Sequence, residues 1–160
     1  MMFFYDKFVV SNRGMPKHEI YIVYTEKGLA YVGVDEFRPP SFVPPKTSLI
    51  SLIYPVFRKQ IEEYFHGERK HFEVNYDIRT TPFCHKVYQE LLSIPYGEVR
   101  TYKEIATNLG MPKGQRAVGQ ALKTNPVPIL IPCHRVVAKS GLGGFSLGIE
   151  LKKQLLTLEQ

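Results

Sequence analysis

The sequence predicts an α+β protein built from two lobes. Three runs rich in β-branched and aromatic residues lie in residues 1–78, whereas helix start signals and helical apolar spacing dominate residues 79–160. The chain has 160 residues, enough for two small lobes or for one domain of typical size. We therefore expect a small sheet-plus-helix lobe over residues 1–78, packed on a helical lobe over residues 79–160.

Strands are expected in the first lobe where β-forming residues are bounded by turn residues. The predicted strands are Phe3–Val10, His18–Thr25 and Leu29–Val34, with a hairpin turn over residues 26–28. Four prolines make residues 38–45 a loop, because proline removes a backbone donor and fixes φ. A second loop, over residues 77–80, marks the expected boundary between the lobes.

One helix is expected between the two loops. Apolar residues recur there at helical spacing up to Gly67, namely Leu49, Leu52, Ile53, Val56, Phe57, Ile61, Tyr64 and Phe65. Pro55 is expected to begin or kink this helix. A short strand is expected at His71–Val74.

The second lobe contains three helix start signals. Thr81 precedes a proline at the first helical position, and Thr101–Glu104 forms a capping box that opens a short helix ended by Gly110. A third helix is expected over Lys113–Thr124. Two short helices joined by a tight turn fit a helix-turn-helix, although many helical hairpins bind no DNA.

Composition and charge limit the classes of function. Hydrophobic residues make up 44% and charged residues 22%, which excludes disorder, and no apolar run is long enough for a membrane span. The first residues lack the features of a signal peptide, so we expect an intracellular, cytoplasmic protein whose two cysteines stay reduced. Residues 79–160 hold eleven Lys/Arg and five Asp/Glu and account for the whole net charge of +6, which favours a polyanionic partner.

Residues 125–137, NPVPILIPCHRVV, contain the residues most suited to chemistry. Three prolines restrict the backbone before a thiol, an imidazole and a guanidinium at Cys133, His134 and Arg135. A neighbouring imidazole or cation is expected to lower the thiol pKa from about 8.5 toward neutrality. Adjacent side chains on an extended backbone point apart, so coupling requires a bend or a bridging water. The alternative is a buried small cysteine beside a hydrogen-bonded core histidine.

Several motifs together resemble those of the O6-alkylguanine-DNA alkyltransferases, also called methylated-DNA–protein-cysteine methyltransferases. These motifs are IPCHRVV at Ile131–Val137, NPVPIL at Asn125–Leu130, RAVGQAL at Arg116–Leu122, IPYGEVRTYKEIA at Ile94–Ala106 and EYFHGERKHFEV at Glu63–Val74. About half of the chain matches closely. The resemblance implies a ribonuclease H-like first lobe and a helix-turn-helix in the second lobe.

The resemblance also implies an activity. The protein would act by direct-reversal DNA repair: it would flip O6-alkylguanine out of double-stranded DNA and transfer the alkyl group irreversibly to Cys133, once per molecule. We expect it to act as a monomer, to use no cofactor and to associate with the nucleoid when bound to DNA. Some relatives hold zinc in the first lobe through cysteine, but this lobe has none, so we expect no metal.

Catalytic roles follow from the same resemblance. Cys133 would be the acceptor, His134 its base through a water molecule, and Glu159 the carboxylate that orients the imidazole. Asn125 would tie the recognition helix to the active-site segment. The Tyr102 side chain would crowd the 3′ phosphate of the target and donate a hydrogen bond to guanine N3.

The remaining site residues would bind DNA or the extrahelical base. Arg116 would fill the vacated stack, and Gly119 would let the second helix approach the DNA backbone. The expected phosphate contacts are Lys103, Lys123 and Lys139. The expected contacts to the base are Arg135, the backbone near Val136, the ring of Phe145 and the hydroxyl of Ser146. Cys84 is expected to take no part.

Three other functions fit parts of the pattern. A non-catalytic sensor of alkyl lesions would lack the cysteine at position 133. A helix-turn-helix regulator would need base-reading side chains, which Ala117, Val118, Gly119 and Ala121 do not supply. A cysteine hydrolase would need an oxyanion hole and a path for turnover.

Overall fold

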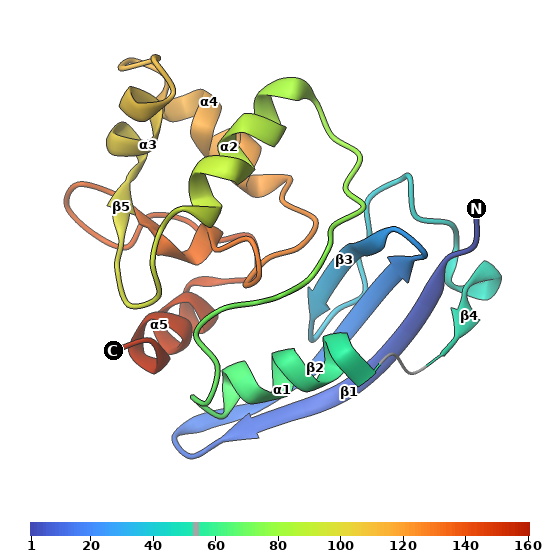
Figure 1. Cartoon of the computed structure of the whole chain (residues 1–160). Coiled ribbons are helices and arrows are strands. Elements are labelled where there is room, and N and C mark those ends of the chain that lie inside the picture. Colours follow the sequence, from blue (N-terminus) through green and yellow to red (C-terminus); the bar gives the residue numbers. More distant parts are fainter. Residues whose placement is uncertain (53–54) are drawn as a thin grey trace. The chain divides into compact units, whose positions relative to one another are not determined.

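The computed structural model describes residues 1–52 and 55–160 (Figure 1). The chain divides into two units, Met1–Arg79 and Thr80–Gln160. Within these described residues, a four-stranded sheet lies in the first unit, and four of the five α-helices lie in the second. The fold class is therefore mixed α+β, as the sequence predicts. No helix in the described part of the chain is long and apolar enough to cross a membrane.

The first unit is built on an antiparallel meander. Its strands are β1 (Phe4–Asn12), β2 (Met15–Thr25) and β3 (Gly28–Val34), and the short β4 (Ile50–Ser51) pairs in parallel with β1. The order in the sheet is β3-β2-β1-β4. The three predicted strands are confirmed. Both strands of the first hairpin reach closer to its turn than predicted: β1 ends two residues later, and β2 begins three residues earlier.

Helix α1 (Pro55–Phe65) runs along the sheet and buries one face of it (Figure 1). Its buried residues are Phe57, Gln60, Ile61, Tyr64 and Phe65. The other face of the sheet carries Tyr21, Val23 and Tyr31, which Val43 and partly buried aromatic residues of the following loop cover. Both faces of the sheet are therefore occupied by apolar side chains.

Two predictions for this unit are wrong. Leu49 and Leu52 lie outside the helix, and residues 50–51 hydrogen-bond to β1 instead. The expectation that Pro55 begins the helix is confirmed, and Ile53 lies outside the described residues. Within the described chain, residues 71–74 form no strand. The side chain of Gln60 makes both backbone hydrogen bonds of Glu73, at 2.8 and 3.1 Å, in place of a neighbouring strand.

In the second unit, helices α2 (Pro82–Leu92), α3 (Tyr102–Asn108) and α4 (Gln115–Lys123) pack against one another. The hydroxyl of Thr81 caps α2, and Thr101 and Glu104 form the predicted capping box of α3. Gly110 follows α3 with φ of +76°, a conformation that glycine adopts without strain. These start and stop signals are confirmed.

The remaining elements of this unit surround the Cys-His-Arg segment. The 3₁₀ turn η2 (Cys133–Arg135) is followed by β6 (Val136–Val137), which pairs in parallel with β5 (Arg100–Thr101). This pairing places the start of α3 beside the residues that follow Cys133. Helix α5 (Ile149–Leu158) is the last element of the unit, and Glu159 is its C-cap residue.

Candidate active site

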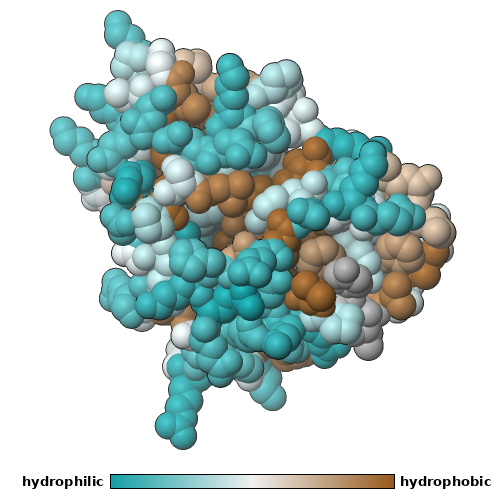
Figure 2. Space-filling view, in the orientation of Figure 1, coloured by the Kyte–Doolittle hydropathy of each residue, from teal (hydrophilic) through white to brown (hydrophobic). Residues whose placement is uncertain are grey.

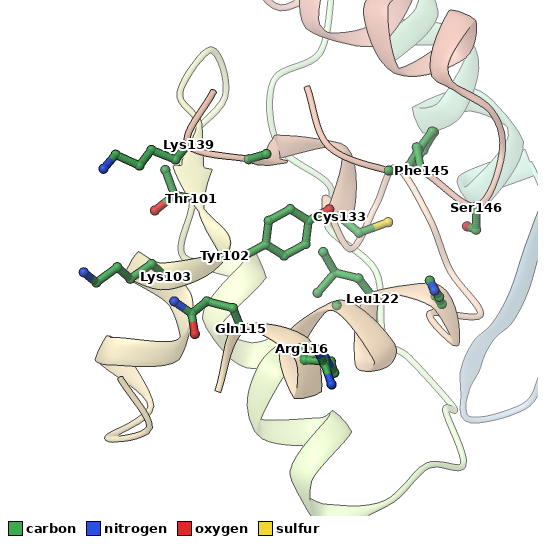
Figure 3. Close-up of a pocket in the computed structure, with 14 residues that line it drawn as sticks. Thr101, Tyr102, Lys103, Gln115, Arg116, Leu122, Cys133, Lys139, Phe145 and Ser146 are labelled. Atoms are coloured by element: carbon green, nitrogen blue, oxygen red, sulfur yellow. The ribbon is translucent and has the colours of Figure 1, made fainter. Parts of the chain in front are cut away.

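Cys133 is one of the residues that line a cleft of about 1240 Å³ in the second unit. Nine of the residues predicted from the sequence line it: Tyr102, Lys103, Arg116, Gly119, Lys123, Cys133, Lys139, Phe145 and Ser146. Figure 3 shows Cys133 with Tyr102 on one side and Ser146 on the other. In the view of Figure 2, the part of the surface around α3 carries mostly hydrophilic side chains.

The charges around this cleft have one sign. Lys103, Arg116, Lys123 and Lys139 line it, and no Asp or Glu is found among its described lining residues. Arg116 and Lys123 extend from α4, whereas Lys103 extends from α3. Four cations on a cleft whose described lining holds no carboxylate create a positive potential that attracts phosphate groups.

The thiol of Cys133 is nearly enclosed, since the residue is 3% exposed. It begins the turn η2, in which the Cys133 amide donates to the carbonyl of Ile131 at 2.8 Å. Burial raises the pKa of the thiol to about 11, against smaller opposite effects of the Asn125 amide and the Lys152 charge. The prediction of a lowered pKa is therefore wrong. In the free protein at neutral pH, the thiol is therefore protonated.

A buried hydrogen-bonded cluster lies beside Cys133. His134 Nε2 is 2.8 Å from Glu159 Oε1, and the Arg135 guanidinium donates to both oxygens of Glu159 at 2.9 Å. A carboxylate held by arginine only accepts, so Nε2 carries the proton of the neutral imidazole and Nδ1 is its basic nitrogen. No described side chain hydrogen-bonds to Nδ1. Burial lowers the pKa of His134, the Glu159 carboxylate opposes this shift, and the Arg135 charge adds to it.

Asn125 connects the end of α4 to the segment before Cys133. Its amide donates to the carbonyl of Ile131 at 2.9 Å, and its oxygen accepts from the amide of Val127 at 3.0 Å. The intervening residues are buried, and Ile129 has φ of +75°, which is unusual for a β-branched residue. The side chain therefore holds the strained loop that delivers Cys133 to the cleft.

Comparison with known proteins places this arrangement in a family. The family model described as 6-O-methylguanine DNA methyltransferase, DNA binding domain, matches residues 82–160. A methylated-DNA–protein-cysteine methyltransferase of Methanosarcina acetivorans is 41% identical over 145 residues, which cover 90% of this chain and 93% of the relative. The chain belongs to the methylated-DNA–protein-cysteine methyltransferase family.

Solved structures agree with this assignment. The crystal structure of the Mycobacterium tuberculosis O6-methylguanine methyltransferase superposes with a TM-score of 0.84 at 35% identity, covering 99% of this chain and 93% of that chain. A structure of the Mycobacterium tuberculosis protein in complex with DNA superposes with a TM-score of 0.80 at 34% identity, covering 97% and 91%. The whole chain, including the first unit, thus has the methyltransferase fold.

Two residues predicted to contact the substrate do not line the cleft of this methyltransferase. Arg135 is turned away from it, because its guanidinium is held by Glu159 and by the carbonyl of Ile94 at 2.8 Å. Val136 is fully buried, and its carbonyl accepts from Lys152 at 2.6 Å. Both residues therefore bond to other residues of the protein and not to a group in the cleft.

Lys152 is a component of the site that the sequence reasoning missed. Its side chain is fully buried and donates to the carbonyls of Val136 and Gly144, on both sides of the cleft-lining loop. Burial lowers its pKa to about 8, and the nearby Cys133 opposes this shift. A signal was present, since Lys152, Leu155 and Glu159 share one helical face at spacings of three and four.

Tyr102 packs against the loop over residues 138–146. A Cβ at Gly143, which has φ of +72°, would come within 2.9 Å of the Tyr102 ring. The ring of Phe145 lies 6.4 Å from that of His134, with an interplanar angle of 70°. Among the described residues, no group of His, Cys, Asp and Glu side chains is arranged to hold a metal ion.

Proposed function

We propose that this protein transfers the alkyl group from O6 of an alkylated guanine in double-stranded DNA to the sulfur of Cys133. The observation that carries the proposal is the position of this thiol in the wall of a cationic cleft, next in the chain to the buried His134–Glu159 pair. Relatives similar to the chain over almost its full length are named for this reaction. The reaction is direct reversal of DNA damage, because the normal base is restored without excision.

DNA binding is assigned to residues 79–160. Helices α3 and α4 would act as a helix-turn-helix, with the cations of the cleft on the phosphate backbone. Lys103, Lys123 and Lys139 would make phosphate contacts. Residues 1–78 would form the ribonuclease H-like lobe. The protein would act as a monomer.

The burial of Cys133 requires the target base to leave the helix. A thiol that is 3% exposed does not reach a guanine stacked within a duplex. Extruding the nucleotide costs a few kcal/mol. Arg116, an exposed residue at the start of α4, would occupy the vacated space. Tyr102 would crowd the adjacent phosphate and support the rotation, and Gly119 would permit close approach.

The chemical step conserves atoms and charge. The Cys133 proton passes through a water molecule to Nδ1 of His134, and the sulfur attacks the alkyl carbon. The new S–C bond forms as the C–O6 bond breaks, and the electron pair of that bond moves to O6. Tyr102 and Ser146 donate hydrogen bonds to the leaving purine. The purine anion takes up one proton from solvent, and His134 releases to solvent the proton that it received from the thiol, so the net change is the exchange of the thiol proton for the alkyl group.

The charges around Cys133 favour this step once a substrate is bound. Glu159 stabilises the imidazolium that forms at His134, while the ammonium of Lys152 stabilises the thiolate. The product is a thioether, which is stable in water. Because Cys84 is the only other cysteine of the chain and does not line the cleft, the protein would react once.

Mass spectrometry tests the proposal directly. The protein is mixed with a duplex that contains a single O6-methylguanine and is then digested with trypsin. We expect a gain of one CH₂ on the peptide that contains Cys133 and none on the Cys84 peptide. Cys133→Ser should abolish the transfer, whereas Cys84→Ser should retain it. Loss of the lesion in the presence of Cys133→Ser would refute the assignment.

A further inference from the structure

Helix α4 presents a mixed face to the cleft. Its lining residues are Gln115, Arg116, Gly119, Leu122 and Lys123. Lysine and arginine side chains can bind phosphate groups, and an arginine can also fill the space that a flipped nucleotide leaves in the base stack. The side chain of leucine and the hydrogen of glycine form no hydrogen bonds. Gln115 is the only carboxamide among the described residues that line the cleft, so it alone presents a neutral donor and an acceptor on two separate atoms side by side.

The amide of Gln115 is available for an external partner. The residue is exposed, and no hydrogen bond or ion pair engages its side chain within residues 1–52 and 55–160. Other polar groups nearby are committed: the Asn125 amide bonds to Ile131, and the Thr101 hydroxyl caps α3. Figure 3 shows that the side chains of Gln115 and Arg116 leave the start of α4 in different directions.

Gln115 and Arg116 are placed for different roles. Arg116 follows Gln115 directly and is assigned to the space that the flipped nucleotide leaves. A side chain one residue earlier on the helix is therefore positioned near the base pair beside the lesion. Carboxamides recognise base edges, because they match the donors and acceptors that bases present, whereas lysine and arginine on phosphates carry no sequence information.

We propose that Gln115 hydrogen-bonds to the edge of a base pair next to the lesion, so that the rate of alkyl transfer depends on the flanking sequence. This inference rests on the proposed function. It adds a specificity determinant to the cationic cleft, whose lysines are assigned to phosphates and whose Arg116 is assigned to the vacated stack. The alkyl-transfer chemistry at Cys133 does not depend on it.

The test compares transfer rates on matched duplexes. Each duplex contains one O6-methylguanine, and the base pairs on its two sides are varied over all combinations. For the wild-type protein we expect at least about a 5-fold spread between the best and worst flanking pair, the effect of one base-edge hydrogen bond. Gln115→Ala should reduce this spread to less than about 2-fold.

Gln120→Ala is the matched control. Gln120 is also an exposed glutamine of α4 but does not line the cleft, so its replacement should leave the spread unchanged. The free O6-methylguanine base has no neighbouring bases and should react equally with the wild type and with Gln115→Ala. The inference is overturned if the wild type shows no spread or if Gln115→Ala retains it. Failure of the proposed function is distinct, because no duplex would then methylate Cys133.

Discussion

Replacing Glu159 by glutamine tests the buried cluster that supports the acceptor cysteine. The carboxylate accepts two hydrogen bonds from Arg135 and is within 2.8 Å of His134 Nε2. The side chains of Glu159 and Arg135 are 1% and 8% exposed, so bulk water hydrates neither charge well. Glutamine keeps the size of the side chain but removes its charge. The guanidinium then stays buried without a counter-ion.

The expected loss of stability is large. Removing one partner of a buried ion pair costs about 3–5 kcal/mol, mainly because the remaining charge is left uncompensated. Since the glutamine carbonyl still accepts one hydrogen bond, we expect the lower end, about 3 kcal/mol. Urea unfolding monitored by circular dichroism should show a lower midpoint. In Glu150→Gln, which changes an exposed glutamate on the same helix, the loss should be below about 0.5 kcal/mol.

A double substitution distinguishes the effect of charge from general damage. Arg135→Met combined with Glu159→Leu removes both charges and fills the space with apolar side chains. Its loss should be smaller than the sum of the two single losses, because no charge remains unpaired. The reasoning is refuted if Glu159→Gln unfolds at the wild-type urea midpoint. It is also refuted if the double variant loses as much stability as Arg135→Met and Glu159→Leu lose in sum.

Three further predictions follow from the charges of the site. In rapid-quench assays the wild-type rate should fall in acid as His134 is protonated, and should fall again above about pH 8, where Lys152 loses the charge that stabilises the thiolate. Below that pH, His134→Gln should react about 100-fold more slowly, and its rate should rise about tenfold per pH unit because the thiol must ionise without a base. The pKa of Lys152 is about 8 in the folded protein and 10.5 ordinarily, so the unfolded state binds more protons between these values. Wild-type stability should therefore rise over this range relative to Lys152→Met, measured by urea unfolding, with Lys153→Met behaving as wild type; equal pH dependence would contradict the assignment. Lys123→Ala should reduce the slope of log DNA affinity against log salt by about 0.9, as titrations would show, whereas Lys86→Ala should not.

Elements defined by neighbouring residues were the most predictable. The caps at Thr81 and Thr101 and the left-handed Gly110 depend on contacts within a few positions, and the structure confirms all three. Leu49 satisfied the helical spacing but lies before α1, because spacing alone does not reveal that a neighbouring segment pairs with β1. The predicted strand near Glu73 failed for a similar reason, since the side chain of Gln60 supplies its backbone partners.

The pocket-lining residues were likewise predictable in part. The motifs around Cys133 and along α3 and α4 contain most of the residues that line the cleft, but the motifs did not indicate which of their side chains face the cleft. Arg135 follows His134 directly, yet it binds Glu159 rather than the cleft. Lys152 shares a helical face with Leu155 and Glu159, but nothing nearby in the chain marks the carbonyls to which it donates.

The sequence by itself determined the α+β class, the helix start signals and the residues able to perform nucleophilic chemistry, since these depend on residue type and short spacing. Only the tertiary structure decided the ionisation of those residues. Burial raises the thiol pKa of Cys133 and lowers that of His134, and the size of such shifts depends on how much water the distant segments exclude. Solvent exclusion is a property of packing between residues far apart in the chain, such as Asn125 and Lys152, which both act on the Cys133 sulfur.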